Sequence, residues 1–468
     1  MHDQAKPGTK ETFRDSISTI SEKGDRAWIY PKKPSGRLYK DRTIVSSILL
    51  ALLFSGPFIR VNGHELMLFN VVQRKFILFG ISFWPQDFFL FVLAMITFIV
   101  FIILFTVVFG RVWCGWACPQ TIFLEMVFRK IEYWIEGDAS RQKLLDASSW
   151  SSEKARKKIS KHIIFFFISF LIANTFLAYI IGTDQLKLLV IDGPGQHMVG
   201  FSALLVFTGV FYGVFSRFRE QACIVVCPYG RLQGVLLDRN SIVVGYDYAR
   251  GEPRGKIRKD AVRREGDCID CKQCVQVCPT GIDIRNGTQL ECVNCTACID
   301  ACNSIMDKVG FKKGLIRYTS EDIIANKKKF HFTPRIIGYS VVLVLLLSTV
   351  TTLLAFRSDT ETTILRTRGQ LYQTISENKI SNLYNVDVVN KTYHDLPLEL
   401  KIKTIRGEIK YVGNELNHVK RDSIVTAEFF LILPESEITG LKTPVVLQVI
   451  SNGKVLEEVK TNFLGPSN

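Results

Sequence analysis

Long apolar runs separated by basic, polar stretches dominate the first three quarters of the chain. Five of these runs carry almost no charge, and each is close to the roughly 20 residues that an α-helix needs to cross a bilayer. They are residues 43–59, 88–110, 163–182, 198–216 and 336–356. The pattern predicts a multi-pass α-helical membrane protein with five spans, which places the two termini on opposite sides of the membrane.

After the last run the pattern changes to short strands in which apolar and polar residues alternate. Such strands are predicted at residues 398–402, 424–430 and 445–450. A turn at residues 451–454 follows the third of them and leads into a fourth strand at residues 455–459. A turn that joins two alternating strands is typical of a β-hairpin. Residues 358–468 are therefore predicted to form a small β-sandwich.

Four polar or mixed segments complete the pattern. We expect residues 1–42 to be a mostly disordered cytoplasmic arm and residues 64–80 to be a short hairpin or an interfacial element on the outer face. Residues 122–132 place apolar side chains at helical spacing with charges between them, which predicts an amphipathic helix on the membrane surface. Residues 137–162 are polar and basic and are predicted to form a loop.

The positive charge is distributed unevenly between these segments. Lys and Arg number ten in residues 1–42, ten in 110–162 and twenty-one in 217–335, but only two in 61–85 and one in 183–197. The first three segments are therefore expected on the cytoplasmic side. Because the basic residues flank the spans, we attribute the net charge of +15 to topology and to anionic lipid, and we exclude nucleic-acid binding.

Potential metal ligands are most concentrated at residues 268–302, where eight of the twelve cysteines form two Cys-x2-Cys-x2-Cys-x3-Cys runs. In bacterial ferredoxins, three thiolates of such a run bind one cubane and the fourth crosses to the other cluster. The predicted ligands of one [4Fe–4S] cluster are Cys268, Cys271, Cys274 and Cys302. Those of the other cluster are Cys278, Cys292, Cys295 and Cys298.

Two other uses of these cysteines fit the sequence less well. A zinc ribbon needs two Cys-x2-Cys knuckles and leaves the additional cysteine steps unexplained. A disulfide framework conflicts with the absence of a secretory signal and with the position of all twelve cysteines in, or at the edge of, segments assigned to the reducing side.

Two further pairs follow spans that return to the cytoplasm, and each has the form Cys-x3-Cys-Pro: they are Cys114 with Cys118, and Cys223 with Cys227. The repetition suggests two related helical hairpins. Residues i and i+4 share one face of a helix, so the four thiols are expected to converge in one site.

Soft thiolates select Cu(I), zinc or iron–sulfur clusters. The nearby Arg111, Arg217 and Arg219 are expected to lower the thiol pKa values. Four ordinary buried cysteines are the alternative.

Five segments together resemble the cytochrome c oxidase accessory proteins called CcoG, FixG or RdxA: residues 110–115, 227–233, 250–256, 278–285 and 314–318. The resemblance extends from about residue 26 to the C-terminus. It implies a membrane-bound polyferredoxin of the bacterial inner membrane, with an immunoglobulin-like periplasmic domain. It also implies a role in assembly of cbb3-type cytochrome oxidase, by reduction of Cu(II) to Cu(I), with oxidase subunits or copper chaperones as partners.

The expected organisation has five parts. The arm of residues 1–42 is followed by a four-helix membrane region at 43–235 that contains both Cys-x3-Cys-Pro motifs. A cytoplasmic ferredoxin module with two [4Fe–4S] clusters and its linkers occupies residues 236–335. The fifth transmembrane helix covers residues 336–357, and the immunoglobulin-like β-sandwich covers residues 358–468.

These parts suggest a route for electrons. A cytoplasmic donor of unknown identity would reduce the clusters, which would pass electrons to copper held by the four catalytic thiols of Cys114, Cys118, Cys223 and Cys227. One alternative is a quinol-linked membrane ferredoxin of a respiratory chain, although no Cys-x2-Cys-His motif for c-type haem is present. Another is a redox-sensing scaffold whose β-domain binds an oxidase subunit.

Overall fold

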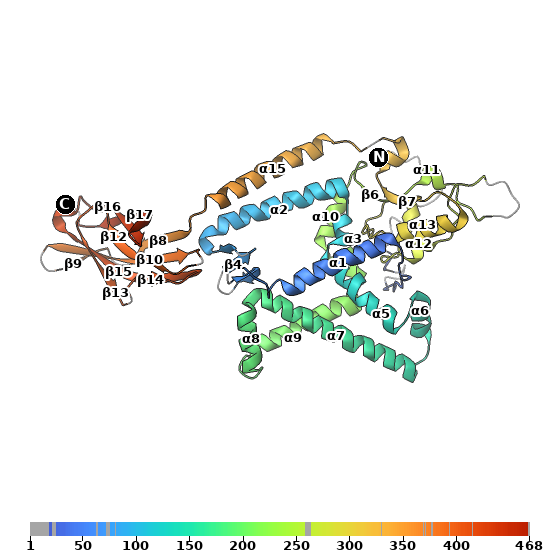
Figure 1. Ribbon diagram of the computed structural model, residues 1–468, viewed down its shortest axis with the longest axis horizontal. Coiled ribbons are helices and arrows are strands. Elements are labelled where there is room, and N and C mark those ends of the chain that lie inside the picture. The colour runs from blue at the N-terminus through green and yellow to red at the C-terminus, as the bar shows by residue number, and fades with distance from the viewer. Residues whose placement is uncertain are drawn as a thin grey trace. The chain divides into compact units, whose positions relative to one another are not determined.

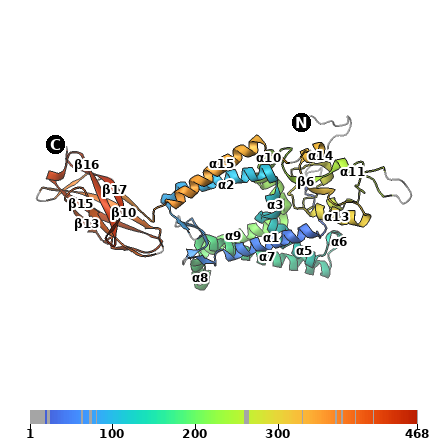
Figure 2. The same ribbon diagram turned by 45° about the horizontal axis from the view of Figure 1, so that its top comes forward.

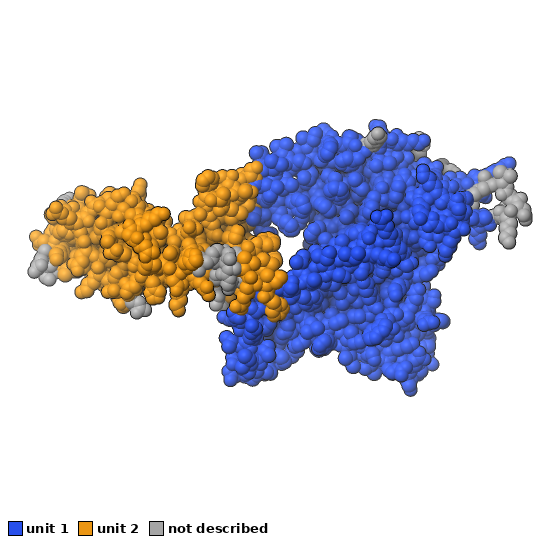
Figure 3. All heavy atoms as spheres, viewed as in Figure 1, with its two compact units in different colours: residues 1–57, 94–347 blue, residues 58–93, 348–468 orange. Residues whose placement is uncertain are grey.

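The computed structural model describes residues 18–20, 25–61, 64–71, 75–79, 81–257, 264–328, 330–367, 369, 371–375, 378–392, 394–413 and 415–466. Its chain divides into two compact units, which Figure 3 colours separately. The first unit consists of residues 1–57 and 94–347, and the second of residues 58–93 and 348–468.

The first unit is mainly helical (Figure 1). Its longer helices are α1 (Arg37–Ser55), α7 (Ser152–Ile181), α8 (Thr183–Asp192), α9 (Met198–Gly213), α10 (Pro228–Leu236) and α13 (Ala297–Val309), with most of α2 (Phe88–Phe109) and α15 (Pro334–Ala355). Its short helices are α3 (Val112–Trp116), α4 (Pro119–Ile122), η2 (Phe123–Phe128), α5 (Arg129–Ile135), α6 (Ala139–Ala147), η3 (Val214–Phe218), η4 (Ala222–Val226), α11 (Tyr248–Gly251), α12 (Gln273–Gln276), η5 (Ile284–Asn286) and α14 (Glu321–Asn326). The strands β6 (Val243–Tyr246) and β7 (Ile316–Thr319) pair antiparallel beside the cysteine-rich loops.

Four helical segments of the described residues are long and apolar enough to cross a membrane: Phe88–Phe109, Ser152–Ile181, Met198–Phe218 and Pro334–Ala355. They coincide with four of the five predicted spans. The fifth prediction, residues 43–59, overlaps α1, whose first turns carry Arg37, Lys40, Asp41 and Arg42 and which is not among the four. The count of five spans stays a prediction.

The predicted loop at residues 137–162 is wrong, because this segment contains α6 and the first turns of α7. Both helices begin at a polar cap: the Asp138 side chain accepts a hydrogen bond from the Ala139 amide, and the Ser151 side chain accepts one from the Lys154 amide. Such caps satisfy backbone donors that a helix leaves free at its N-terminus. The basic residues that follow Ser151 therefore extend α7 well beyond its apolar run.

Residues 122–132 are helical, as predicted, but they do not form an exposed surface helix. The segments α4, η2 and α5 enclose a buried cluster in which Phe123 and Phe128 pack with Phe165 and Phe215. The charged residues between them are buried as well, including Arg129 at 1% exposure. Charged side chains are almost never fully buried unless they are paired. Arg129 pairs with Glu125 in the same segment and with the distant Glu220, and Glu132 pairs with the distant Arg219.

The N-terminal arm is structured where it is described, so the expected disorder is wrong for residues 25–42. The Lys32 amide donates to the Gln276 carbonyl oxygen at 2.8 Å. The Tyr30 hydroxyl donates to Asp146 Oδ2 at 2.6 Å. Residues 1–17 and 21–24 of the arm lie outside the described residues.

The second unit contains the predicted β-sandwich. One sheet has the order β13-β15-β10-β8 with β9 also on β10, and the other has the order β12-β16-β17. Its strands are β8 (Thr360–Arg366), β9 (Gln373–Ile375), β10 (Lys379–Asn390), β11 (Leu396–Pro397), β12 (Glu399–Ile402), β13 (Glu408–Val412), β14 (His418–Val419), β15 (Ser423–Pro434), β16 (Lys442–Ser451) and β17 (Lys454–Leu464). Side chains from both sheets, such as Tyr384, Phe429, Leu447 and Phe463, form one fully buried core. The predicted hairpin is present between β16 and β17, where Asn452 and Gly453 both adopt positive φ.

The segment after α1 also belongs to this unit. It forms β1 (Arg60–Val61), β2 (His64–Glu65), β3 (Met67–Asn70), β4 (Lys75–Leu78) and β5 (Ile81–Phe83), followed by η1 (Pro85–Asp87). The predicted hairpin is present as the antiparallel pair β3–β4, and β5 extends it to a three-stranded sheet. Asp87 forms ion pairs with Arg357 at 2.5 Å and with Lys391 at 2.8 Å, and these charges join this segment to the β-domain.

Candidate cluster and thiol sites

The first predicted ligand set lies where the loop before α12 meets α13. Asp270 and Lys272 adopt left-handed backbone conformations, which curve the chain tightly between the cysteines of this loop. Cys302 reaches the same place from α13. Burial raises the pKa of the Cys302 thiol to about 12, and the neighbouring Cys271 and Cys268 raise it further. The structure therefore brings the distant fourth cysteine to the other three.

The second predicted set lines a small cavity, to which Cys278, Cys292, Cys295 and Cys298 all contribute. Asn294 and Thr296 again have positive φ and wrap the loop around this cavity. Burial raises the pKa of Cys292 to about 12, and nearby Cys278 and Cys295 add to that shift. Thiolates in such a place need a compensating positive charge, which the iron of a cluster supplies when it is bound.

Arg42 on α1 gives an independent indication of a negatively charged group here. This residue is 2% exposed, and its Nε and Nη2 atoms have no hydrogen-bond partner among the described residues. Burial raises the pKa of Cys295 to about 11, and the Arg42 charge is the largest influence that opposes the shift. A buried guanidinium without a partner is costly, whereas a cubane held by four thiolates carries net negative charge. The side chains therefore fit a cluster at this site.

Replacing Arg42 by Met is expected to lower the reduction potential of the cluster at the second site by about 60 mV or more, a tenfold change in a one-electron equilibrium. The cause is the loss of a positive charge that favours the reduced, more negative cluster. Redox titration monitored by EPR measures the potential. The potential of Arg42→Lys should stay close to that of wild type, because the positive charge is kept. Arg37→Met, at an exposed position of the same helix, should leave the potential unchanged. Equal potentials in Arg42→Met and wild type would contradict the assignment.

The four remaining thiols converge, although not for the predicted reason. The charge of a Cys114 thiolate interacts with Cys118 and Cys227, and that of Cys223 interacts with all three others. Neither pair lies on one continuous helix. Cys114 is in α3 and Cys223 in η4, whereas Cys118 and Cys227 are extended N-cap residues before Pro119 and Pro228. Proline favours the first turn of a new helix and an extended residue before it, so each Cys-Pro step ends one helix and begins the next.

The expected lowering of the thiol pKa values is wrong for two of the four. Burial raises the pKa of Cys114 to about 11 and that of Cys223 to about 12, and the opposing effect of Arg111 on Cys114 is smaller. Arg219 is occupied elsewhere, since it forms two hydrogen bonds with Glu132 at 2.6 and 2.8 Å.

Sequence inspection missed Gln233, which lies on α10 and is fully buried beside the four thiols. The Cys114 thiol donates to Gln233 Oε1 at 3.0 Å, and Arg111 Nε donates to the same oxygen at 3.1 Å. Gln233 therefore orients both a thiol and the nearest cation. Its position six residues after Cys227, on the helix that Pro228 begins, is the only signal in the sequence.

The four-thiol site is in direct contact with the loop that carries the second cluster set. A Cβ atom on Gly115 would lie 2.5 Å from the Val293 carbonyl oxygen and 2.6 Å from that of Asn294. Trp116 Nε1, one residue further on, donates to the Tyr318 hydroxyl at 2.9 Å. Only glycine permits so close an approach of α3 to this loop. Helix α3, which carries Cys114, is therefore in contact with the loop that carries Cys292 and Cys295.

Among the residues that the structure describes, no group of three or more His, Cys, Asp or Glu side chains is arranged to hold a single metal ion.

A buried ion-pair network lies next to these sites and was not predicted. Its members are Glu125, Arg129, Glu132, Glu136, Lys158, Lys161, Arg219 and Glu220. Arg129 pairs with Glu220 at 3.0 Å and donates to the carbonyl oxygen of Pro279 at 3.2 Å. Since Pro279 directly follows Cys278, the network reaches the loop of the second cluster set.

Three family models match the chain. A model described as "4Fe-4S dicluster domain" matches residues 218–321, and one described as "4Fe-4S binding domain" matches residues 91–141. A third, "IG-like fold at C-terminal of FixG, putative oxidoreductase", matches residues 350–466. The first two matches include both Cys-x3-Cys-Pro pairs as well as the eight other cysteines.

Curated relatives cover most of the same residues. The "Nitrogen fixation protein FixG" of Rhizobium meliloti is 38% identical over 313 residues, which span 64% of this chain and 59% of that protein. The proteins RdxB and RdxA of Cereibacter sphaeroides are each 33% identical. The RdxB match covers 80% of this chain and 81% of RdxB, and the RdxA match covers 82% and 83%.

Proposed function

Because this chain belongs to the FixG/RdxA family of membrane-associated iron–sulfur electron-transfer proteins, we propose that it passes single electrons through two [4Fe–4S] clusters to the four-thiol site and there reduces Cu(II) to Cu(I). The Cu(I) would supply the copper site of a cbb3-type cytochrome oxidase during assembly. Cys268, Cys271, Cys274 and Cys302 are the proposed ligands of one cluster, and Cys278, Cys292, Cys295 and Cys298 those of the other.

The observation that supports this proposal is the contact between Gly115 and the backbone of Val293 and Asn294. The contact joins α3, which carries Cys114, to the loop that carries Cys292 and Cys295. Cys274 and Cys298 are also electrostatic neighbours, so the two cluster sets adjoin each other. Three redox sites would then follow one another without an intervening domain.

Copper is the proposed substrate, and thiolates suit the product better than the reactant. Soft thiolates favour Cu(I) over Cu(II), and each reduction needs one electron, which matches a one-electron carrier. The high pKa values of Cys114 and Cys223 mean that copper binding there would release protons. A single ion would use two of the four thiols or draw the others toward it, since no three are already close enough.

A third [4Fe–4S] cluster at the four thiols is the second candidate. The family model that matches residues 91–141 describes a 4Fe-4S binding domain and includes Cys114 and Cys118. In this case the site would be a further carrier of electrons, and copper would be reduced elsewhere or not at all.

We further propose an orientation and a partner. The basic segments would lie on the cytoplasmic side of a bacterial inner membrane, so that the cluster module of residues 236–335 receives electrons there. The β-sandwich of residues 358–468 would lie in the periplasm and would bind oxidase subunits or a copper chaperone. A scaffold function would need only this binding, and would persist in a protein without clusters.

Replacement of Cys114, Cys118, Cys223 and Cys227 by Ser is expected to abolish Cu(II) reduction and to leave two cubanes intact. The measurement is anaerobic EPR of dithionite-reduced protein, freed of excess dithionite and titrated with Cu(II), together with iron analysis. In wild type, the cluster signals should disappear as Cu(II) becomes EPR-silent.

The same variant separates the two candidates. Loss of four irons per chain with two cubanes retained would identify a third cluster at the four thiols. Copper reduction at the wild-type rate in the variant would refute the copper role of these cysteines.

A further inference from the structure

A groove between α7 and α9 opens on the side of the helices that bears exposed aromatic and aliphatic side chains. The two helices lie side by side (Figures 1 and 2). The groove has a volume of about 1050 Å³. We call it the α7–α9 groove; its lining includes Trp150, Ile163, Phe166, Phe167, Phe170 and Leu205. Apolar pockets of about this size with a few polar groups are typical of small-molecule sites.

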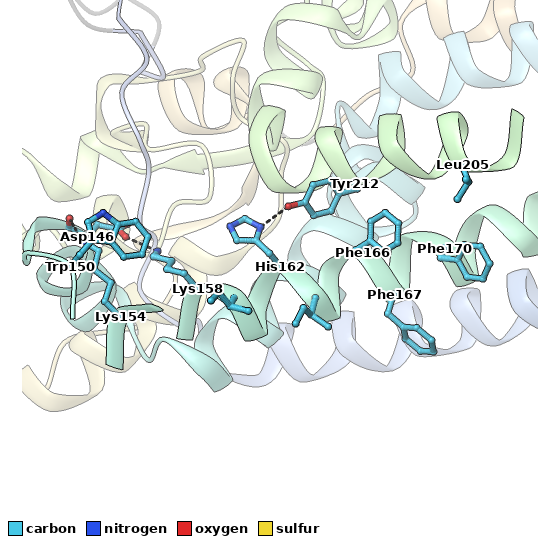
Figure 4. Close-up of a pocket in the computed structure, with 12 residues that line it drawn as sticks. Asp146, Trp150, Lys154, Lys158, His162, Phe166, Phe167, Phe170, Leu205 and Tyr212 are labelled. Atoms are coloured by element: carbon cyan, nitrogen blue, oxygen red, sulfur yellow. Dashed lines mark hydrogen bonds and ion pairs between the residues drawn. The ribbon is translucent and has the colours of Figure 1, made fainter. Parts of the chain in front are cut away.

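The polar groups in the apolar part of the groove are an imidazole and a phenol. His162 Nδ1 and the Tyr212 hydroxyl are 2.7 Å apart, and Figure 4 shows them turned toward each other from α7 and α9. Phe166 is next to the pair, with its ring centroid 6.1 Å from that of Tyr212. A group that exchanges protons therefore lies against an aromatic wall, in which the rings of Phe166 and Tyr212 meet at 68°.

The basic residues at the polar end of the groove are already satisfied. Lys154 donates to the carbonyl oxygens of Asp146 and Ser148, and Lys158 forms ion pairs with Asp146 at 2.6 Å and Glu136 at 2.9 Å. An anionic phospholipid headgroup would have to break these interactions to bind. A neutral ring compound would not, and it could stack on the aromatic wall.

The groove is joined to the cluster loop by buried charged groups. His162 also lines a polar cavity that contains Glu132, Glu136 and Arg219. From there the ion-pair network continues through Glu220 to Arg129, which donates to the Pro279 carbonyl oxygen. Carboxylates of this network could accept protons from His162, which lines the same cavity.

We propose that the α7–α9 groove is a quinol-oxidation site, and that a membrane quinol is the electron donor of the clusters. The inference rests on the proposed electron-transfer function and names its donor. Oxidation of one quinol breaks two O–H bonds and yields one quinone, two electrons and two protons. Each of two oxidised [4Fe–4S] clusters accepts one electron. The protons leave through the His162–Tyr212 pair and the carboxylates of the network to water.

Binding and electron transfer are tested separately on purified protein that contains its clusters. Photolabelling with an azidoquinone should modify residues of α7 and α9 in the groove. Mixing oxidised protein anaerobically with excess decylubiquinol should reduce the clusters, which optical absorbance and EPR follow. Tyr212→Phe should slow this reduction by about fivefold, the effect of one lost hydrogen bond, and Ile163→Trp should prevent both labelling and rapid reduction by filling the groove.

Matched controls exclude general damage. Tyr179→Phe removes a hydroxyl of α7 that donates to the Leu53 carbonyl oxygen, and Leu171→Trp enlarges an exposed side chain of α7 that does not line the groove. Both should behave as wild type, and iron content should be equal throughout. Labelling elsewhere, labelling displaced only by anionic phospholipid, no reduction of the clusters by quinol, or equal reduction rates in all variants would overturn the proposal.

The two proposals fail in different ways. Copper reduction driven by dithionite needs no quinone, so its absence would refute the copper function and leave the groove assignment standing. Normal copper reduction, together with groove variants whose clusters are reduced by quinol at the wild-type rate, would refute only the assignment of the groove as a quinol site.

Discussion

Replacement of Gly115 by Ala is expected to slow electron transfer to the four-thiol site more than about tenfold, because small displacements of reacting groups have large kinetic effects. The added methyl group would lie 2.5 and 2.6 Å from two carbonyl oxygens of the loop at Val293 and Asn294. Both atoms belong to the backbone, so the loop or α3 must move. Overpacking of this kind costs about 1–3 kcal/mol of stability.

The measurement is the rate at which pre-reduced protein makes Cu(II) EPR-silent, with iron content determined in parallel. Gly209→Ala on α9 is the matched control, since a Cβ atom there meets nothing within 4 Å and the substitution also replaces a helical glycine. Gly209→Ala should react at the wild-type rate. An unchanged rate in Gly115→Ala would show that the contact between α3 and the loop does not carry the electrons.

The sequence predicted those features that depend on local spacing. The Cys-x2-Cys-x2-Cys-x3-Cys runs are predicted because a cubane needs thiolates at short, fixed intervals, and the structure brings Cys302 to Cys268 and Cys271. The β16–β17 hairpin is predicted because Asn452 and Gly453 tolerate positive φ. Four of the five apolar runs correspond to helices long enough to span a bilayer.

Features that depend on distant partners were not predictable in this way. In the sequence, Glu132 and Arg129 look like the polar face of a surface helix. In the structure, Glu132 pairs with Arg219 and Arg129 pairs with Glu220. Arg42 resembles an ordinary basic residue before a span, although its side chain is buried near Cys295. Hydrophobic periodicity indicates which face of a helix is apolar, but it does not indicate which charges pair across the fold.

The same partners explain why the Cys-x3-Cys pairs converge. The spacing alone suggested that both cysteines of a pair lie on one face of a helix. Pro119 and Pro228, however, each begin a new helix directly after Cys118 and Cys227. Convergence then depends on α3, η4 and α10 packing together, with Gln233 fixing Cys114 and Arg111. These contacts are made between segments more than a hundred residues apart, so they cannot be predicted from a local sequence pattern.

Replacement of Glu132 by Gln is expected to destabilise the first unit by about 3–5 kcal/mol, the usual cost of removing one partner from a buried ion pair. Glu132 is 4% exposed and accepts two hydrogen bonds from Arg219, which is equally buried. The amide cannot neutralise that guanidinium, and Glu220 lies further away, at 3.6 Å. A lower thermal unfolding temperature of the detergent-solubilised protein would measure the effect.

Two comparisons distinguish this electrostatic cause from a packing defect. The double variant Glu132→Gln with Arg219→Met should recover part of the lost stability, because it leaves no unpaired charge. Glu458→Gln removes an exposed partner of Lys403 in the β-domain and should leave the unfolding temperature unchanged. A double variant that is less stable than the single variant would contradict the ion-pair explanation.

The pH dependence supplies an independent check of the same pair. Burial alone would raise the pKa of Glu132, but the charge and hydrogen bonds of Arg219 lower it below its ordinary value of 4.5. A carboxyl group whose pKa is lower in the folded state stabilises the fold above its ordinary pKa, and this contribution is lost as the pH falls through the folded value. Wild type should therefore lose unfolding temperature below about pH 4.5 more steeply than Glu132→Gln, which has no carboxylate to protonate. Parallel curves in acid would show that the charge of Glu132 does not stabilise the fold.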